Sequence, residues 1–254
     1  MKTTKKDISS KLAGLLIQIH EGKNRPLVRR QASQLLGRIG PDDIAKAEHR
    51  LLKNGFTAEQ IQQLCAAFVL MGGMEAGKTD IVRRLPEGHV LRKVAAEHDM
   101  IRCFLADLEE TAEEIGSSRA LSSASPELLR LSHIVEHLQG MSEHIAREED
   151  VIFPMLRGQG WKSLCSLMEK DHRTLGIAID DLFKLRLAFE TLAPGVFKSQ
   201  LISLVRYLVP VMREHLFREE SILFALVLTV TTDPLFWDRM KAVCREIDYC
   251  GIHP

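Results

Sequence analysis

The feature that most constrains this chain is a histidine at a core position in each of four long amphipathic segments. Apolar residues recur at helical spacing over four stretches, and this period predicts amphipathic helices. The four stretches are 89–116, 126–157, 161–190 and 196–228. Within each apolar stripe one histidine stands where an aliphatic residue is expected, and these are His98, His144, His172 and His215. Four long helices with short connections predict an up-down-up-down four-helix bundle in an all-α protein.

In two of these segments, a glutamate follows the histidine by four residues. The pairs are His144–Glu148 and His215–Glu219. Residues four apart share a helix face, so both members of each pair are expected to point into the core. Burying carboxylates and imidazoles among apolar side chains is costly unless partners compensate them. A lone buried histidine is more often a core residue than a ligand, but the repeated pair favours a bound cation.

The predicted metal-ligand set is the four histidines together with the two glutamates. Its members are His98, His144, Glu148, His172, His215 and Glu219. Bridging carboxylates suit two ions rather than one, and imidazole with carboxylate suits iron, zinc or manganese alike. A ferritin-type site needs Glu-x-x-His on two helices, and only Glu169–His172 has that spacing. No His-Glu-x-x-His zincin motif is present.

Acidic residues beside these ligands have two readings. One acidic residue precedes each histidine, and these are Glu97, Glu143, Asp171 and Glu214. A residue one position away lies about 100° round the helix, so these side chains either act at the site, by orienting a neighbouring histidine or lining a ligand channel, or form a solvated flank. Glu149 and Glu220 are alternative candidates for the ligand positions of Glu148 and Glu219. The spacing of four residues from the histidine favours Glu148 and Glu219. His137, seven residues before His144, is either a guard of an access route or a core residue.

The sequence around these residues resembles the hemerythrin-like HHE cation-binding family. The matching elements are EHDMI around His98, HIAREEDVIFP from His144, KDHRTL around His172 and EHLFREESILF around His215. The resemblance extends over about residues 86–228. It implies a non-haem centre of two iron ions, oxo- or hydroxo-bridged, with the six residues above as ligands.

Two departures from the oxygen-carrying hemerythrins concern the ligands. Those proteins have a second histidine one turn along the third helix, where this chain has Gly176. Their fourth-helix motif ends with an aspartate five residues after the histidine, whereas Glu219 here follows His215 by four. In these respects the chain resembles the branch linked to nitric-oxide stress and iron–sulfur repair more than the oxygen carriers.

Three functions are compatible with such a centre. The leading hypothesis is a di-iron protein that binds a diatomic ligand, O₂ or NO, in stress sensing, defence or iron-centre repair. An alternative is an enzyme that reduces NO or peroxide with electrons from a redox partner protein, since no GxGxxG nucleotide motif is present. A third is an iron-dependent signalling module in which the N-terminal region is an adaptor or forms a homodimer.

The chain divides into two predicted domains. Residues 1–80 read as a small helical domain of unknown function, in which Pro26 and Pro41 begin helices and a later helix ends at Gly72–Gly73. Residues 86–254 form the bundle with a short C-terminal helix, and 74–88 are a linker. The N-terminal part resembles an uncharacterised helical domain that precedes such bundles. Pro210 is expected to kink or break the fourth bundle helix.

Composition excludes some partners. The 34 basic and 34 acidic residues cancel, so no global field attracts nucleic acid or an anionic membrane. The most apolar stretch, Ile222–Val230, is too short for a transmembrane segment, and the N-terminus lacks the apolar core of a signal peptide. A cytoplasmic protein is predicted. Its five cysteines lack CxxC spacing and are expected to be small core residues, as the apolar neighbours of Cys65 and Cys103 indicate.

Overall fold

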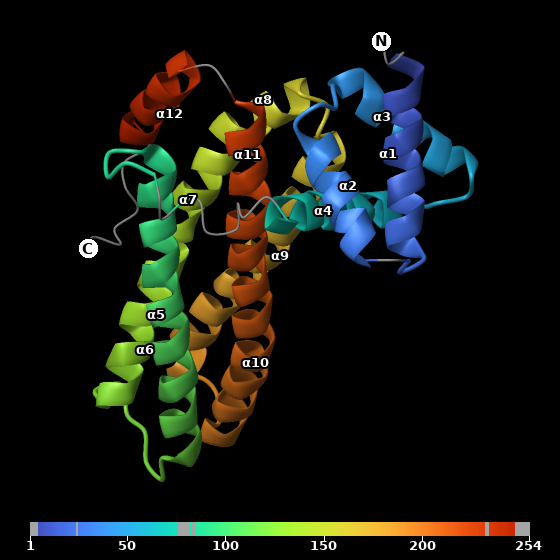
Figure 1. Cartoon of the computed structure of the whole chain (residues 1–254). Coiled ribbons are helices and arrows are strands. Elements are labelled where there is room, and N and C mark those ends of the chain that lie inside the picture. Colours follow the sequence, from blue (N-terminus) through green and yellow to red (C-terminus); the bar gives the residue numbers. More distant parts are fainter. Residues whose placement is uncertain (1–4, 24, 76–81, 83–84, 232–233, 247–254) are drawn as a thin grey trace.

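The computed structural model describes residues 5–23, 25–75, 82, 85–231 and 234–246. Within these residues the regular elements are all helical, so the predicted all-α class is confirmed. Figure 1 shows a long bundle beside a smaller group of helices at the N-terminus. None of the described helices combines the length and the apolarity needed to cross a membrane.

Four helical rods make up the bundle and alternate in direction (Figure 1). The first rod is α5 (Val90–Ser117), and the third is α9 (Lys162–Leu187), which ends in the short 3₁₀ turn η3 (Ala188–Glu190). The second rod consists of α6 (Pro126–Gln139), α7 (Met141–Arg147), η2 (Glu148–Ile152) and α8 (Phe153–Gly158). The fourth consists of α10 (Pro194–Arg218), η4 (Glu219–Leu223) and α11 (Phe224–Val230), and α12 (Pro234–Glu246) packs against α5 and η2. The predicted up-down-up-down order is confirmed.

The second and fourth rods are not the unbroken α-helices that the sequence predicts. Each contains one π-helical segment, η2 or η4, and each segment begins at a glutamate of the predicted ligand set. In the second rod Pro154 lies two residues beyond η2, and proline lacks the amide that an α-helix would use there. The fourth rod has no proline at this place. Pro210 lies inside α10, which continues through it as an α-helix, so the predicted break is absent.

The hydrophobic core of the bundle is divided into two clusters. One cluster includes Val94 on α5, Ile152 on the second rod and Met168 on α9. The other includes Ile101 on α5 and Leu175 on α9, together with the buried apolar residues of α10. The residues between the two clusters along each rod are the histidines and glutamates of the predicted metal site. A polar layer therefore crosses the bundle at one level, with apolar packing on both sides of it.

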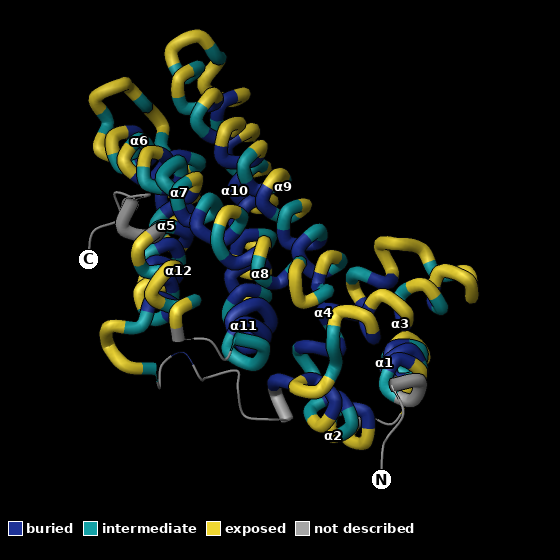
Figure 2. Tube along the Cα trace, turned by 90° about the horizontal axis from the view of Figure 1, so that it is seen from above, coloured by how far each residue is buried: buried dark blue, intermediate teal, exposed yellow. Residues whose placement is uncertain are grey.

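In the described part of the chain four α-helices precede the bundle, and α2 and α3 begin within one residue of the prolines that predict them. They are α1 (Lys5–His20), α2 (Arg25–Leu36), α3 (Pro41–Lys53) and α4 (Ala58–Glu75). A capping box begins α4: the Thr57 amide donates to Gln60 Oε1 at 2.9 Å, and the Gln60 amide donates to Thr57 Oγ1 at 3.1 Å. Residues of these helices join the same apolar cluster as the nearer end of the bundle, and Figure 2 shows buried positions on both.

The end of α4 was predicted wrongly, because the helix continues through Gly72 and Gly73 to Glu75. Gly72 is a place where another backbone comes close, and Gly73 also faces a neighbouring element. A Cβ on Gly72 would lie 3.2 Å from the Ala32 carbonyl carbon on α2. A Cβ on Gly73 would lie 3.7 Å from the Ser221 carbonyl oxygen, in η4. Gly72 therefore lets α4 pack closely against α2, while Gly73 is in ordinary contact with the fourth rod. Most of the predicted linker, 74–88, lies outside the described residues.

The cysteines agree only partly with their predicted core positions. Cys65 and Cys165 are buried, but Cys103 is exposed. Cys103 follows the buried Ile101 by two residues, which turns it about 200° round α5 and away from the core. The side chains of Cys244 and Cys250 lie outside the described part of the chain.

Gly160, in the connection between α8 and α9, provides a test of how the N-terminal helices and the bundle fit together. Its φ is +92°, and a Cβ there would lie 2.6 Å from Pro41 Cα at the start of α3. Gly160→Ala is therefore expected to destabilise the protein by about 1–3 kcal/mol, from overpacking together with backbone strain. Gly158→Ala, where a Cβ meets nothing within 4 Å, is the matched control. Equal urea midpoints for the two variants would contradict this packing.

Candidate metal centre

All six residues of the predicted ligand set are buried and lie in the polar layer of the bundle. Each rod contributes at least one of them: His98 from α5, His144 from α7 with Glu148 from η2, His172 from α9, and His215 from α10 with Glu219 from η4. None has more than 3 % of its surface exposed, so these charged and polar groups are cut off from water. Their compensation must come from one another or from a bound cation.

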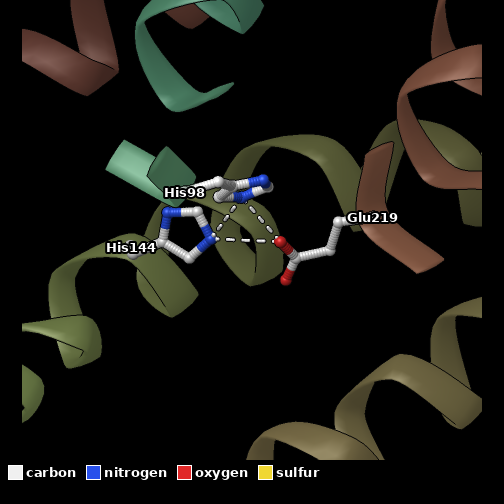
Figure 3. Close-up of side chains that lie close together, drawn as sticks. All are labelled: His98, His144 and Glu219. Atoms are coloured by element: carbon white, nitrogen blue, oxygen red, sulfur yellow. Dashed lines mark hydrogen bonds and ion pairs between the residues drawn. The ribbon is translucent and has the colours of Figure 1, made fainter. Parts of the chain in front are cut away.

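Glu219 lies between two pairs of histidines and directs one carboxylate oxygen toward each pair. Its Oε2 is 2.7 Å from His98 Nε2 and 3.4 Å from His144 Nε2, and Figure 3 shows these three side chains converging. Its Oε1 is 2.6 Å from His215 Nε2 and 3.9 Å from His172 Nε2. A carboxylate shared in this way can bridge two ions.

Two groups of potential ligand atoms result, and they share Glu219. One group is His98, His144 and Glu219, and the other is His172, His215 and Glu219; within each, the ligand atoms lie within 4.8 Å of one another. Glu148 belongs to neither group, although its Oε2 is 3.3 Å from His172 Nε2. Its place as the sixth ligand therefore stays a prediction.

Unpaired polar atoms show that the cluster fits a cation. Several buried ligand atoms have no hydrogen-bond partner: both oxygens of Glu148, Oε1 of Glu219, and Nε2 of His172 and of His215. Leaving such atoms unsatisfied is costly in a protein core. Imidazole nitrogens and carboxylate oxygens together suit iron, zinc or manganese, and a bound ion would satisfy these atoms at once.

A carboxylate lies behind each of the four histidines, on the Nδ1 side of the ring. The Nδ1 atoms of His98, His144, His172 and His215 lie 2.9 Å from Glu220, 3.0 Å from Glu97, 2.7 Å from Glu149 and 3.8 Å from Asp171. A carboxylate at Nδ1 favours the tautomer whose Nε2 lone pair is free for a metal, and it fixes the direction of the ring. Each of these acids acts on a histidine of another helix.

These contacts decide between the two readings of the neighbouring acids. Glu97 lies within hydrogen-bond distance of a histidine, and Asp171 faces one at 3.8 Å, so both lie toward the cluster rather than on a solvated flank. Glu214 is exposed and pairs with Arg218, as a solvated flank would. No described contact joins Glu143 to any of the four histidines. Glu149 and Glu220 face the Nδ1 side of their histidines, away from the Nε2 atoms that converge on Glu219.

Two arginines complete the arrangement and were not predicted from the sequence. Arg147 donates to Glu97 Oε2 at 2.5 Å, and Arg218 donates to Asp171 Oδ2 at 2.5 Å. Each follows a ligand histidine by three residues, in a repeated pattern His-x-x-Arg-Glu-Glu at 144–149 and 215–220. That repeat is the signal that identifies both arginines in the sequence.

His137 lies outside the cluster. Its ring is half-buried and stacks on Phe104, with ring centroids 4.4 Å apart, and it also contacts His133. No described contact links it to the six residues, so a role in access stays a prediction.

The charges of the cluster shift its pKa values strongly. Burial lowers the pKa of His172, but Glu148, Glu219 and Glu149 outweigh burial and raise it to about 10. Burial likewise lowers the pKa of His215, whereas Glu219 and Asp171 raise it to about 9. Burial raises the pKa of Glu219, yet the surrounding histidines hold it well below its usual value. In the protein without metal, the carboxylates therefore favour the charged form of His172 and His215.

Comparison with known families agrees with this geometry. Residues 89–227 match the Hemerythrin HHE cation binding domain. The chain belongs to the hemerythrin family. The matched hemerythrin domain includes the four rods almost entirely, and therefore all six predicted ligands. Residues 12–70 match a family of unknown function, DUF438. No curated protein matches the chain.

The raised histidine pKa values predict how the hemerythrin domain responds to pH. A histidine whose pKa is raised by folding stabilises the fold fully below its unfolded pKa of about 6.5 and loses that contribution as pH rises through the folded pKa. Metal-free protein is therefore expected to lose stability between about pH 7 and pH 10, through the values of His215 and His172. Thermal unfolding with a chelator, compared with metal-loaded protein, measures this. A metal-free melting temperature that stays constant or rises over that range would contradict the assignment.

Proposed function

We propose that this hemerythrin domain binds two iron ions and that its centre binds a diatomic ligand, O₂ or NO. The observation that carries the proposal is Glu219, whose two oxygens lie 2.7 Å and 2.6 Å from His98 and His215, on opposite sides of the site. With His144, His172 and Glu148, the set provides fewer ligands than two six-coordinate ions require. Iron held in this way would supply open coordination positions for a small ligand.

The protein's own residues would orient the ligands and exclude water. The carboxylates at Nδ1 hold the four imidazole rings, and two phenylalanines cover rings on either half of the site. Phe224 stacks on His98 with centroids 5.4 Å apart, and Phe153 stacks on His172 with centroids 5.7 Å apart. Each phenylalanine follows a ligand glutamate by five residues. The apolar clusters on both sides of the layer keep water away, and such surroundings favour a neutral diatomic ligand over a charged one.

We place this function in the response to NO or oxygen stress, including repair of damaged iron centres. The support is the resemblance described above and the glycine at position 176, where oxygen carriers have a further histidine. A Cβ at Gly176 would meet nothing within 4 Å, so no neighbouring side chain takes the place of that histidine.

A second candidate function, iron-dependent signalling through the N-terminal helices, has one contact in its favour. Gly73 of α4 packs against the Ser221 carbonyl of η4, the segment that also contributes Glu219. Binding of iron at Glu219 would then change the contact between η4 and α4. Size-exclusion chromatography of iron-loaded and metal-free protein tests it, because this function requires a change of assembly state with loading, and identical profiles would argue against it.

The principal test is reconstitution with Fe(II) under anaerobic conditions. The wild-type protein is expected to bind about two iron ions per chain and to change its optical spectrum when NO is added. The double variant His144→Ala/His215→Ala removes one ligand from each half, so we expect it to lose most of the iron. His137→Ala is the matched control, since His137 lies on the same rod outside the cluster. A stable, folded wild-type protein that binds no iron would refute the proposal.

A further inference from the structure

The polar layer is built from two halves that repeat the same parts. The α5 half comprises His98 and His144 with Glu220 and Glu97 behind them, and the α9 half comprises His172 and His215 with Glu149 and Asp171 behind them. Glu219 lies between the halves. Three differences between corresponding parts all favour the α5 half as the more firmly held.

The first difference is an arginine that pairs with the carboxylate behind the first histidine of the α5 half. Arg102, four residues after His98, lies 2.8 Å from Glu220 Oε1 and holds that carboxylate against His98. The corresponding position on α9, four residues after His172, is Gly176. Within the described residues, Glu149 has no ion pair except that with His172, and 38 % of its side chain is exposed against 28 % for Glu220.

The second difference is the length of an acidic side chain. Glu97 lies 3.0 Å from His144 Nδ1, within hydrogen-bond distance. The corresponding acid in the α9 half is Asp171, which is one methylene shorter, and its distance to His215 Nδ1 is 3.8 Å. That distance exceeds a hydrogen bond, and Nδ1 of His215 is without a hydrogen-bond partner. The ring of His215 is therefore less firmly oriented than the ring of His144.

The third difference is access to water. In the α5 half, the pair Arg147–Glu97 has 2 % and 7 % of its side chains exposed. In the α9 half, the corresponding pair Arg218–Asp171 has 21 % and 18 % exposed. Water at these groups screens their charges and competes for their hydrogen bonds, which weakens their hold on the histidine.

We propose that the two metal positions are unequal and that the position in the α9 half, between His172 and His215, releases its ion first. The lack of a cation at position 176 and the short side chain of Asp171 loosen it, and Arg102 is the positioning residue that tightens the α5 half. This inference rests on the proposed two-metal centre. It gives that centre one exchangeable ion and one retained ion, so that iron can be delivered while His98 and His144 keep the site assembled.

The test follows iron release from anaerobically loaded Fe(II) protein after rapid mixing with an excess of a coloured Fe(II) chelator. We expect two phases of equal amplitude, one ion each, with rates that differ by about tenfold or more, because partners behind the ligands commonly change metal affinity by about 10–100-fold. Arg102→Ala is expected to accelerate the slow phase and leave the fast phase unchanged.

Two substitutions in the α9 half are expected to have the opposite effect, a slower release of iron. Gly176→Arg places a cation where Arg102 lies in the other half and is expected to slow the fast phase by about tenfold. Gly176→Ala is the matched control, since it adds helix propensity without the charge, and its fast phase should equal that of the wild type. Asp171→Glu restores the missing methylene and should also slow the fast phase.

The outcomes separate this inference from the proposed function. Two ions released in one phase from the wild type would overturn the inequality while leaving a two-iron centre intact. An Arg102→Ala variant that accelerates the fast phase would overturn the assignment of the halves. A protein that binds no iron overturns both proposals. If Gly176→Arg does not fold, Arg102→Ala and Asp171→Glu still decide the matter.

Discussion

Four imidazoles and two carboxylates share one level of an otherwise apolar bundle, and their mutual compensation governs the rest of the structure. Glu219 makes this compensation local, since its two oxygens face histidines of all four rods. Groups of this kind are tolerated in a core only when each charge or lone pair has a partner. The apolar clusters on both sides of the layer exclude water and thereby strengthen every contact within it.

Charge alternates outward from the centre of the bundle. The histidines surround Glu219, a carboxylate lies behind each histidine, and arginines lie behind three of those carboxylates: Arg102, Arg147 and Arg218. Each shell neutralises the one inside it, so the centre can be buried without a large net charge. Where the outermost shell is incomplete, beside Gly176, the shell inside it is more exposed. This gap is one of the three differences on which the proposed inequality between the two metal positions rests.

The N-terminal helices are part of this arrangement because α4 packs on the fourth rod beside the metal layer. Gly73 touches η4 there, Gly72 allows the close approach of α4 to α2, and Gly160 allows the connection between α8 and α9 to meet α3. One apolar cluster contains residues of both regions. The division into domains at 1–80 and 86–254 is predicted from the sequence alone. In the folded chain the two regions pack against each other at η4. Glu219 is thus two residues away from Ser221, which contacts α4 directly.

From the sequence alone, helical phase was enough to place the four histidines, Glu148 and Glu219 on the inner faces of four helices. Phase follows from the geometry of one helix, and so does the order of the bundle from its short connections. The sequence did not determine which acid supports which histidine. Glu97 contacts His144 and Glu149 contacts His172, and in each pair the two residues lie on different rods. The sequence also did not determine the π-helical segments that begin at Glu148 and Glu219, because tertiary packing can override the local preference for an α-helix. Contacts between helices depend on how the rods are rotated against one another, and only the packed tertiary structure sets that rotation.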